Sequence, residues 1–199
     1  MKKLIIKTTI ITIASIIGAI LLTYLTFLAF FPGKLARFYD KVGFERQAVK
    51  QMVREHHKTG DLQDLITLCE YCDKYGNNWL IAQYFGDLVT KQEFIDYTEA
   101  IENGSEFYDF CAGKYVVALY ETGKDERFVV DTAFAVTRAY VEYNPVHALI
   151  SVALEREAVD GTTLTFIVDG LTNLLTTASS QEVALINSDI EFITGVLTQ

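Results

Sequence analysis

The residues whose side chains carry the most chemistry are three cysteines, at positions 69, 72 and 111, and three histidines, at positions 56, 57 and 147. Cys69 and Cys72 form a CxxC pair, which in redox enzymes lies at a helix N-terminus, where the helix dipole lowers the thiol pKa. Here the pair continues an apolar helical stripe that begins at Leu62, so both cysteines are predicted to be small buried hydrophobic residues in mid-helix. Cys111 is interpreted in the same way, and an odd, sparse set of cysteines predicts no disulfide framework.

His56 and His57, together with Cys69 and Cys72, supply the donor types that zinc prefers. A helical hairpin that turns at Gly60 would place His57 opposite the start of the next helix, whereas Cys69 lies roughly 10 Å farther along that helix. The four side chains cannot then share one coordination sphere of ~2.3 Å radius. We therefore predict no metal site, and the two histidines are interpreted as residues that face the negative end of a helix dipole.

No local signature of catalysis accompanies these residues. The chain contains no glycine-rich phosphate loop, no GxSxG and no HExxH, and its acidic groups have spacings typical of solvated helix faces. We therefore predict a protein that is not an enzyme and that binds no cofactor. An enzymatic alternative stays open, in which a deep pocket brings together two or more of His56, His57, His147 and the acidic groups.

Aromatic residues are abundant, with eleven Tyr and thirteen Phe in 199 residues. Large rings commonly fill the gaps between short helices, so most of them are expected in the core. The segments 79–85 and 107–110 nevertheless contain more aromatic rings than a single buried helix face requires for packing. We therefore name Trp79, Tyr84, Phe85 and Tyr108 as candidate residues for contacts with a protein or peptide partner.

The elements that must position these residues are predicted to be helices. Beyond Pro32, apolar residues recur with helical spacing and no segment shows sustained polar–apolar alternation, so the fold class is all-α. Helices are predicted over roughly 44–58, 79–89, 107–122 and 146–159, and another over 183–197. Each of the first four is followed by a short polar turn and a second helix, beginning at Leu62, Phe94, Phe128 and Leu164. These starts are 32, 34 and 36 residues apart, a period that predicts stacked helical hairpins.

Several helix ends are marked by residues that satisfy free backbone groups. Capping-box spacing occurs in three pairs, Thr90 with Glu93, Asn103 with Glu106, and Ser179 with Glu182. Asn144 followed by Pro145 predicts an N-cap and a first helical residue. The glycines that follow apolar-periodic stretches are predicted as C-caps, where a left-handed backbone conformation is favoured; they are Gly60, Gly76, Gly123 and Gly161.

The stretch from Gly60-Asp61-Leu62 through Asn77-Asn78-Trp79 to Phe94 and Ala100-Ile101 resembles the helix–turn–helix phrase of tetratricopeptide repeats. The resemblance implies a right-handed α-solenoid-like stack of helical hairpins. It also implies a concave face that binds peptides or partner proteins, an expectation that rests on analogy between folds.

The segment Thr8–Phe31 carries no charge and is dominated by Ile, Leu, Phe, Ala and Thr. As a helix it is roughly 36 Å long, which spans a ~30 Å hydrocarbon core with some tilt. We predict a single-pass transmembrane anchor in preference to a cleaved signal peptide. The reasons are that the apolar run is longer than the roughly 7–15 residues usual in signal peptides, and that no small-x-small cleavage site follows it.

Basic residues flank the apolar segment on both sides, so the positive-inside rule does not decide its orientation. They are Lys2, Lys3 and Lys7 before it, and Lys34, Arg37, Lys41, Arg46 and Lys50 after it. A very short basic N-terminal tail is typical of a signal anchor whose N-terminus stays in the cytosol. We therefore expect a protein of the cell membrane with an extracytoplasmic soluble domain.

The formal net charge of −9 argues against nucleic acid as a partner, and against an anionic lipid surface as the main ligand of the soluble domain. The predicted organisation is a basic tail (1–7), a transmembrane helix (8–31), a juxtamembrane linker or helix (32–43) and a helical-repeat domain (44–199). It predicts a membrane-tethered scaffold or adaptor that binds a protein or peptide partner near the bilayer. The alternative is an accessory subunit of a larger membrane complex, packed through small residues around Gly18 and Ala19.

Overall fold

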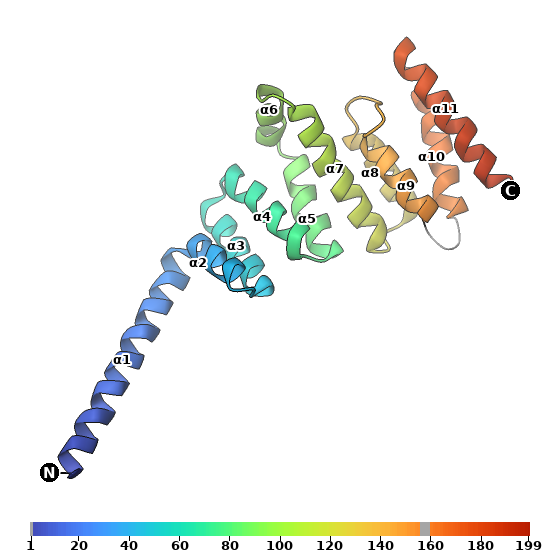
Figure 1. Cartoon of the computed structure of the whole chain (residues 1–199). Helices are drawn as coiled ribbons and strands as arrows, with labels where there is room; N and C mark the ends of the chain where they lie inside the picture. Colours follow the sequence, from blue (N-terminus) through green and yellow to red (C-terminus); the bar gives the residue numbers. More distant parts are fainter. Residues whose placement is uncertain (1, 156–159) are drawn as a thin grey trace. The chain divides into compact units, whose positions relative to one another are not determined.

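The computed structural model describes residues 2–155 and 160–199, which form eleven α-helices and, within those ranges, no β-strand (Figure 1). The predicted all-α class is thereby confirmed. The chain divides into two compact units, Met1–Tyr75 and Gly76–Gln199, which are described separately below. The boundary between the units lies inside the range 44–199 that the sequence predicts as one repeat domain.

The first unit contains four helices: α1 (Lys2–Phe30), α2 (Pro32–Lys41), α3 (Glu45–Thr59) and α4 (Leu62–Tyr75). α1 covers nearly all of the predicted segment 8–31 and also includes basic residues of the predicted tail. α2 occupies most of the predicted juxtamembrane stretch and packs on α3, which packs on α4. Proline at the first position of α2 is favourable because that position has no intrahelical partner for an N–H group.

A small core joins α2, α3 and α4. Its buried side chains include Leu35, Ala36, Ala48, Val49, Met52, Leu65, Ile66 and Leu68. By contrast, no part of the apolar segment Ile6–Phe30 of α1 is buried. Among the described residues α1 is the one helix long and apolar enough to cross a membrane; a signal sequence near an N-terminus has the same features.

The second unit contains seven helices: α5 (Asn78–Val89), α6 (Gln92–Ala100), α7 (Gly104–Glu121), α8 (Glu126–Val136), α9 (Pro145–Glu155), α10 (Gly161–Leu174) and α11 (Ser180–Leu197). Helices that pack on one another are often two apart in the chain order: α5 packs on α7, α7 on α9, and α8 on α10. α8 also packs on α7 and α9, and α11 packs on α10 (Figure 1). The helices predicted from residue 44 onward all occur within a few residues of their predicted starts, while residues 156–159 of the predicted helix 146–159 lie outside the described residues.

The predicted N-caps differ in outcome. Ser179 and Glu182 form the expected capping box at the start of α11, and the side chain of Asn144 caps α9. The prediction for Thr90 is wrong, since its hydroxyl donates backward to the carbonyl of Gly86 at 2.8 Å and closes α5 instead. The prediction for Asn103 is also wrong, because its backbone is left-handed, with φ of 59°, and its side chain makes no cap hydrogen bond.

Two of the four predicted C-cap glycines, Gly60 and Gly123, have the expected left-handed backbone conformation. Gly60 and Gly123 have φ of 66° and 71° and follow α3 and α7. Gly76 follows α4 but is not left-handed. Gly161 is no C-cap, because it is the first residue of α10, whose N-cap Asp160 accepts a hydrogen bond from the backbone N–H of Thr163 at 3.1 Å.

Candidate functional site

The four aromatic residues proposed from the sequence lie in different environments. Tyr84 and Phe85 on α5 and Tyr108 on α7 are buried in the second unit. The hydroxyl of Tyr108 donates to the carbonyl of Val89 at 3.4 Å, so even its polar end is directed into the protein. These three rings therefore belong to the core, whereas Trp79, at the start of α5, keeps 63% of its surface exposed.

An apolar hollow of the second unit lies where α7 meets α9 and the 137–144 loop, which joins α8 to α9. Its volume is about 710 Å³. Its walls include Phe110, Gly113, Lys114 and Val117 of α7, Ala148 of α9, and Val141 and Tyr143 of the loop. We refer to this hollow as the α7–α9 groove. Phe110 is 51% exposed and Tyr143 is 85% exposed, so two aromatic rings are available to a ligand.

The 137–144 loop is fixed near its start by Arg138. The guanidinium group of Arg138 lies over the ring of Tyr108, 4.3 Å from the ring centroid, and donates to the carboxylate of Glu99 at 3.2 Å. Stacking on an aromatic face and pairing with a carboxylate are both interactions that the planar guanidinium favours. The loop is therefore tied to α6 and α7.

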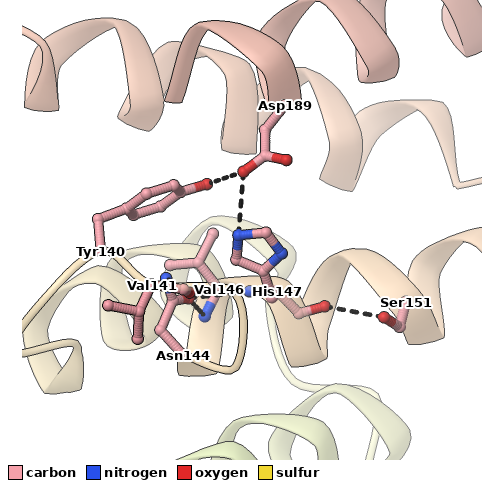
Figure 2. A network of polar contacts seen from close by, with 7 residues as sticks. All are labelled: Tyr140, Val141, Asn144, Val146, His147, Ser151 and Asp189. Carbon is pink, nitrogen blue, oxygen red and sulfur yellow. Dashed lines mark hydrogen bonds and ion pairs between the residues drawn. The ribbon is translucent and has the colours of Figure 1, made fainter. Parts of the chain in front are cut away.

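Tyr140 ties the middle of the same loop to α11. Its backbone N–H donates to Glu182 at 3.1 Å, and its hydroxyl donates to Oδ2 of Asp189 at 2.6 Å (Figure 2). Nε2 of His147, on α9, lies 3.0 Å from the same oxygen. Burial, followed by the hydrogen bond to Asp189, raises the pKa of Tyr140, so its hydroxyl keeps its proton and stays a donor.

Asn144 closes the loop. Its side-chain oxygen accepts hydrogen bonds from the backbone N–H groups of Val146 and His147, at 2.8 and 3.0 Å, and its side-chain NH₂ donates to the carbonyl of Val141 at 2.7 Å (Figure 2). Asn144, which makes all three of these hydrogen bonds, is itself buried. The loop is thus held at Arg138, Tyr140 and Asn144, while Val141 and Tyr143 between these points remain exposed.

A second hollow of about 650 Å³ lies on α11's side of the loop. It is lined by Val141 and Tyr143 again and by Ser179, Gln181, Glu182 and Leu185 of α11 and its N-cap. Because Val141 and Tyr143 line both hollows, the loop forms a ridge between them. Loops that a rigid scaffold holds in place are common carriers of binding residues.

The second unit is strongly acidic. Residues 76–199 contain six Lys and Arg against nineteen Asp and Glu. Two of these acids, Glu106 and Asp109, line the α7–α9 groove. Burial raises the pKa of Asp109, an effect that the charge of Arg138 opposes. Lys114 lies over the ring of Phe110, 5.3 Å from its centroid. The groove therefore combines apolar walls with an acidic edge, which favours a ligand that carries both apolar and cationic groups.

The reactive residues named from the sequence are spread over several helices in the described part of the chain: His56 and His57 lie on α3, Cys69 and Cys72 on α4, Cys111 on α7 and His147 on α9. Cys69 and Cys72 are buried on α4, as predicted, and burial raises the pKa of the Cys72 thiol to about 12. No group of three or more His, Cys, Asp and Glu is placed to hold a metal ion in residues 2–155 and 160–199. Ser151, near His147, donates its hydroxyl to the His147 carbonyl at 3.0 Å, so its hydrogen bond is not to the imidazole ring (Figure 2).

Sequence reasoning did not select Phe110, Val141 or Tyr143. Phe110 lies two residues from the buried Tyr108, which places it on another face of α7. Tyr143 directly precedes the cap residue Asn144, in a segment between two amphipathic helices. An aromatic residue in such a short connection between two helices is unusual, and this feature of the sequence could have identified Tyr143. Comparison with protein-family models, with curated proteins and with solved structures found no match.

Proposed function

We propose that this protein is a membrane-tethered helical-repeat scaffold, and that its second unit binds a protein or peptide segment in the α7–α9 groove. The observation that carries the proposal is the rigidly held 137–144 loop, which keeps Tyr143 85% exposed beside an apolar groove. A large exposed aromatic ring on a fixed backbone loses little conformational freedom when a partner binds, and such residues commonly dominate binding energy.

The tether in this proposal is α1. Its polar side chains suit a hydrocarbon environment, because the hydroxyls of Thr12, Thr23 and Thr26 donate to backbone carbonyls four residues earlier, at 3.0, 2.9 and 2.9 Å. Hydroxyls paired in this way leave no unsatisfied donor toward lipid. We propose a retained signal anchor, with the N-terminus in the cytosol and the remainder of the chain on the extracytoplasmic side.

The scaffold in this proposal is the layered arrangement of the second unit. α5, α7 and α9 are successive neighbours in one layer, and α8 and α10 are neighbours in another. Packing between helices two apart in the chain is what a stack of helical hairpins requires, which supports an α-solenoid-like stack of the tetratricopeptide type. Helical stacks of this kind provide extended binding surfaces.

The partner segment is argued from the chemistry of the groove. Phe110, Val117 and Val141 offer apolar contacts, so the segment should insert a bulky apolar side chain. The acidic groups Glu106 and Asp109, in a unit with thirteen more acids than bases, favour Lys or Arg beside that side chain. We therefore propose a partner with a basic and apolar segment.

The experiment places a photoreactive amino acid at Tyr143 of the full-length chain in its host membrane. Irradiation should yield one discrete adduct, and sequencing of the crosslinked segment should find an apolar residue flanked by Lys or Arg. Phe110→Ser should reduce the adduct about tenfold or more, since exposed aromatic anchors are worth ~1.4 kcal/mol and upward in binding.

Phe128 provides a matched control, because it is an aromatic residue on α8 with the same 51% exposure as Phe110 and does not line the groove. Phe128→Ser should leave the Tyr143 adduct unchanged. The groove proposal would be abandoned if Phe110→Ser had no larger effect than Phe128→Ser, or if no discrete adduct formed at Tyr143.

A further inference from the structure

The first unit has an electrostatic character opposite to that of the second. Residues 1–75 contain eleven Lys and Arg against seven Asp and Glu, although the whole chain has a net charge of −9. The stretch from α2 into α3, residues 32–50, carries Lys34, Arg37, Lys41, Arg46 and Lys50 against Asp40 and Glu45. The cations therefore gather directly after the apolar helix α1, at the level where lipid headgroups would lie if α1 spans a bilayer.

A groove of about 510 Å³ lies in the angle between α1 and α2. It is lined by Ala19, Ile20, Thr23, Tyr24 and Phe27 of α1 and by Lys34, Leu35 and Phe38 of α2. The hydroxyl of Thr23 donates to the Ala19 carbonyl at 2.9 Å, so this residue adds no unpaired donor to the wall. The groove is thus almost wholly apolar, with one cation, Lys34, among its lining residues.

The corner between the two helices is held by polar contacts. The backbone N–H of Gly33 donates to Glu55 at 3.0 Å, and the ammonium group of Lys58 donates to the Phe30 carbonyl at 2.8 Å. The hydroxyls of Tyr24 and Tyr39 lie 3.0 Å apart and join α1 to α2 a little farther from the corner. Because both helices are fixed to one another and to α3, the groove is preformed.

Two acidic residues near the groove, Glu55 and Asp40, already have hydrogen-bond partners. Glu55 accepts from Gly33, and Asp40 accepts from the Tyr75 hydroxyl and from Lys74. The hydrogen bonds that Asp40 accepts hold its pKa below its usual range. The bond from Tyr75 has the larger effect and the bond from Lys74 the smaller one. The exposed cations Lys34, Arg37 and Lys41 lie three and four residues apart, so they share one side of α2 with Phe38.

We propose that the groove between α1 and α2 binds one anionic phospholipid, whose acyl chain lies along Ala19, Ile20 and Phe27 and whose phosphate contacts Lys34, the cation that lines the groove. The inference rests on the proposed anchoring of α1 in a membrane. Charge complementarity selects the occupant: the groove joins an apolar wall to a cationic edge, and an anionic phospholipid joins an acyl chain to a phosphate. The exposed residues Phe30 and Phe31 lie at the corner where α1 ends and α2 begins.

The test uses the full-length chain with tryptophan fluorescence as the probe. Trp79 is the only tryptophan and lies in the second unit, so Trp79→Phe removes the background and Phe38→Trp places a reporter in the groove. The protein is reconstituted in phosphatidylcholine vesicles that contain the same fraction of either brominated phosphatidylcholine or brominated phosphatidylglycerol. We expect brominated phosphatidylglycerol to occupy the site about fivefold more readily, as one cation near an anionic headgroup implies.

Lys34→Gln should abolish most of this preference, because Lys34 is the cation among the lining residues. Lys50→Gln is the control, because Lys50 is an exposed cation on α3 that does not line the groove. Equal quenching by the two lipids, or equal loss of preference in the Lys50→Gln control, would overturn the lipid site while leaving the anchor intact. An absence of quenching by either lipid would show that α1 and α2 are not in the bilayer, which would overturn the anchor as well.

Discussion

A single oxygen atom, Oδ2 of Asp189, joins the 137–144 loop and α9 to α11. It accepts a hydrogen bond from Tyr140 and lies 3.0 Å from Nε2 of His147. Tyr140→Phe removes the hydroxyl and should lower the free energy of unfolding by about 1–3 kcal/mol, as expected for a partly buried hydrogen bond to a carboxylate. Urea unfolding of the full-length chain in detergent micelles measures the change.

Tyr143→Phe is the matched control, because this tyrosine is three residues away and is 85% exposed. Its hydroxyl should be worth less than about 0.5 kcal/mol to stability, as usual for surface changes. If the two substitutions had equal effects, the hydroxyl of Tyr140 would not be a support of the loop.

Glu182 makes the same region sensitive to acid. The Ser179 hydroxyl, then the Ser179 backbone N–H, then the Tyr140 backbone N–H lower the pKa of Glu182. Its folded pKa is therefore below its unfolded value, so its stabilising effect is fully present above the ordinary glutamate pKa of ~4.3 and is lost as the pH falls through the lower folded value.

Glu182→Gln should accordingly make the melting temperature less dependent on pH below ~4.3 than in the wild-type chain. Circular dichroism melting curves at a series of pH values from neutral to strongly acidic would check this. A variant whose melting temperature falls as steeply in acid as that of the wild type would contradict the assignment of a stabilising role to the ionised carboxylate.

At the scale of helices, sequence periodicity predicted most of the fold. The apolar stripes placed α3 to α11 within a few residues of their observed starts, because burial of one helix face requires side chains that repeat with the helical period. The Ser179–Glu182 capping box was predictable for the same reason, since it involves residues three apart on a helix. The failures at Thr90 and Asn103 have a local cause, because adjacent helices end and begin within three residues of each.

The candidate site was much less predictable. Its supporting contacts join Arg138 to Glu99 and Tyr140 to Asp189, pairs that are 39 and 49 residues apart in the chain. Such pairs depend on how whole helices pack, and no local spacing encodes them. The density of aromatic residues indicated the right helix, α7, but could not show that Tyr108 faces the core while Phe110 faces the groove.

The junction between α6 and α7 tests helix packing directly. Gly104 begins α7, and a Cβ atom there would lie 1.7 Å from the backbone oxygen of Thr98 on α6. Since that neighbour is backbone, Gly104→Ala requires the helices to shift, and we expect a loss of stability of about 1–3 kcal/mol. Gly195→Ala in α11 is the control, because a Cβ atom there meets nothing within 4 Å.

The control should be neutral or stabilising by up to ~1 kcal/mol, since alanine is the better helix former. Thermal unfolding of both variants beside the wild-type chain would measure the difference. Equal stability of Gly104→Ala and Gly195→Ala would mean that the backbone of Thr98 does not approach Gly104 closely enough to exclude a Cβ atom.

At the scale of the whole molecule, the two units carry net charges of opposite sign. The first 75 residues carry four more bases than acids, and the remaining residues carry thirteen more acids than bases. An anionic membrane surface would attract the first unit and repel the second.

The location of the α7–α9 groove relative to the membrane is testable because the native cysteines Cys69, Cys72 and Cys111 are all buried. A membrane-impermeant maleimide should therefore label the folded wild-type protein weakly, and Tyr143→Cys should add one exposed thiol. We expect that thiol to be labelled in intact cells, with the protein in the membrane fraction. Labelling only after permeabilisation would place the groove in the cytosol, and recovery of the labelled protein in the soluble fraction would show that α1 is a cleaved signal sequence.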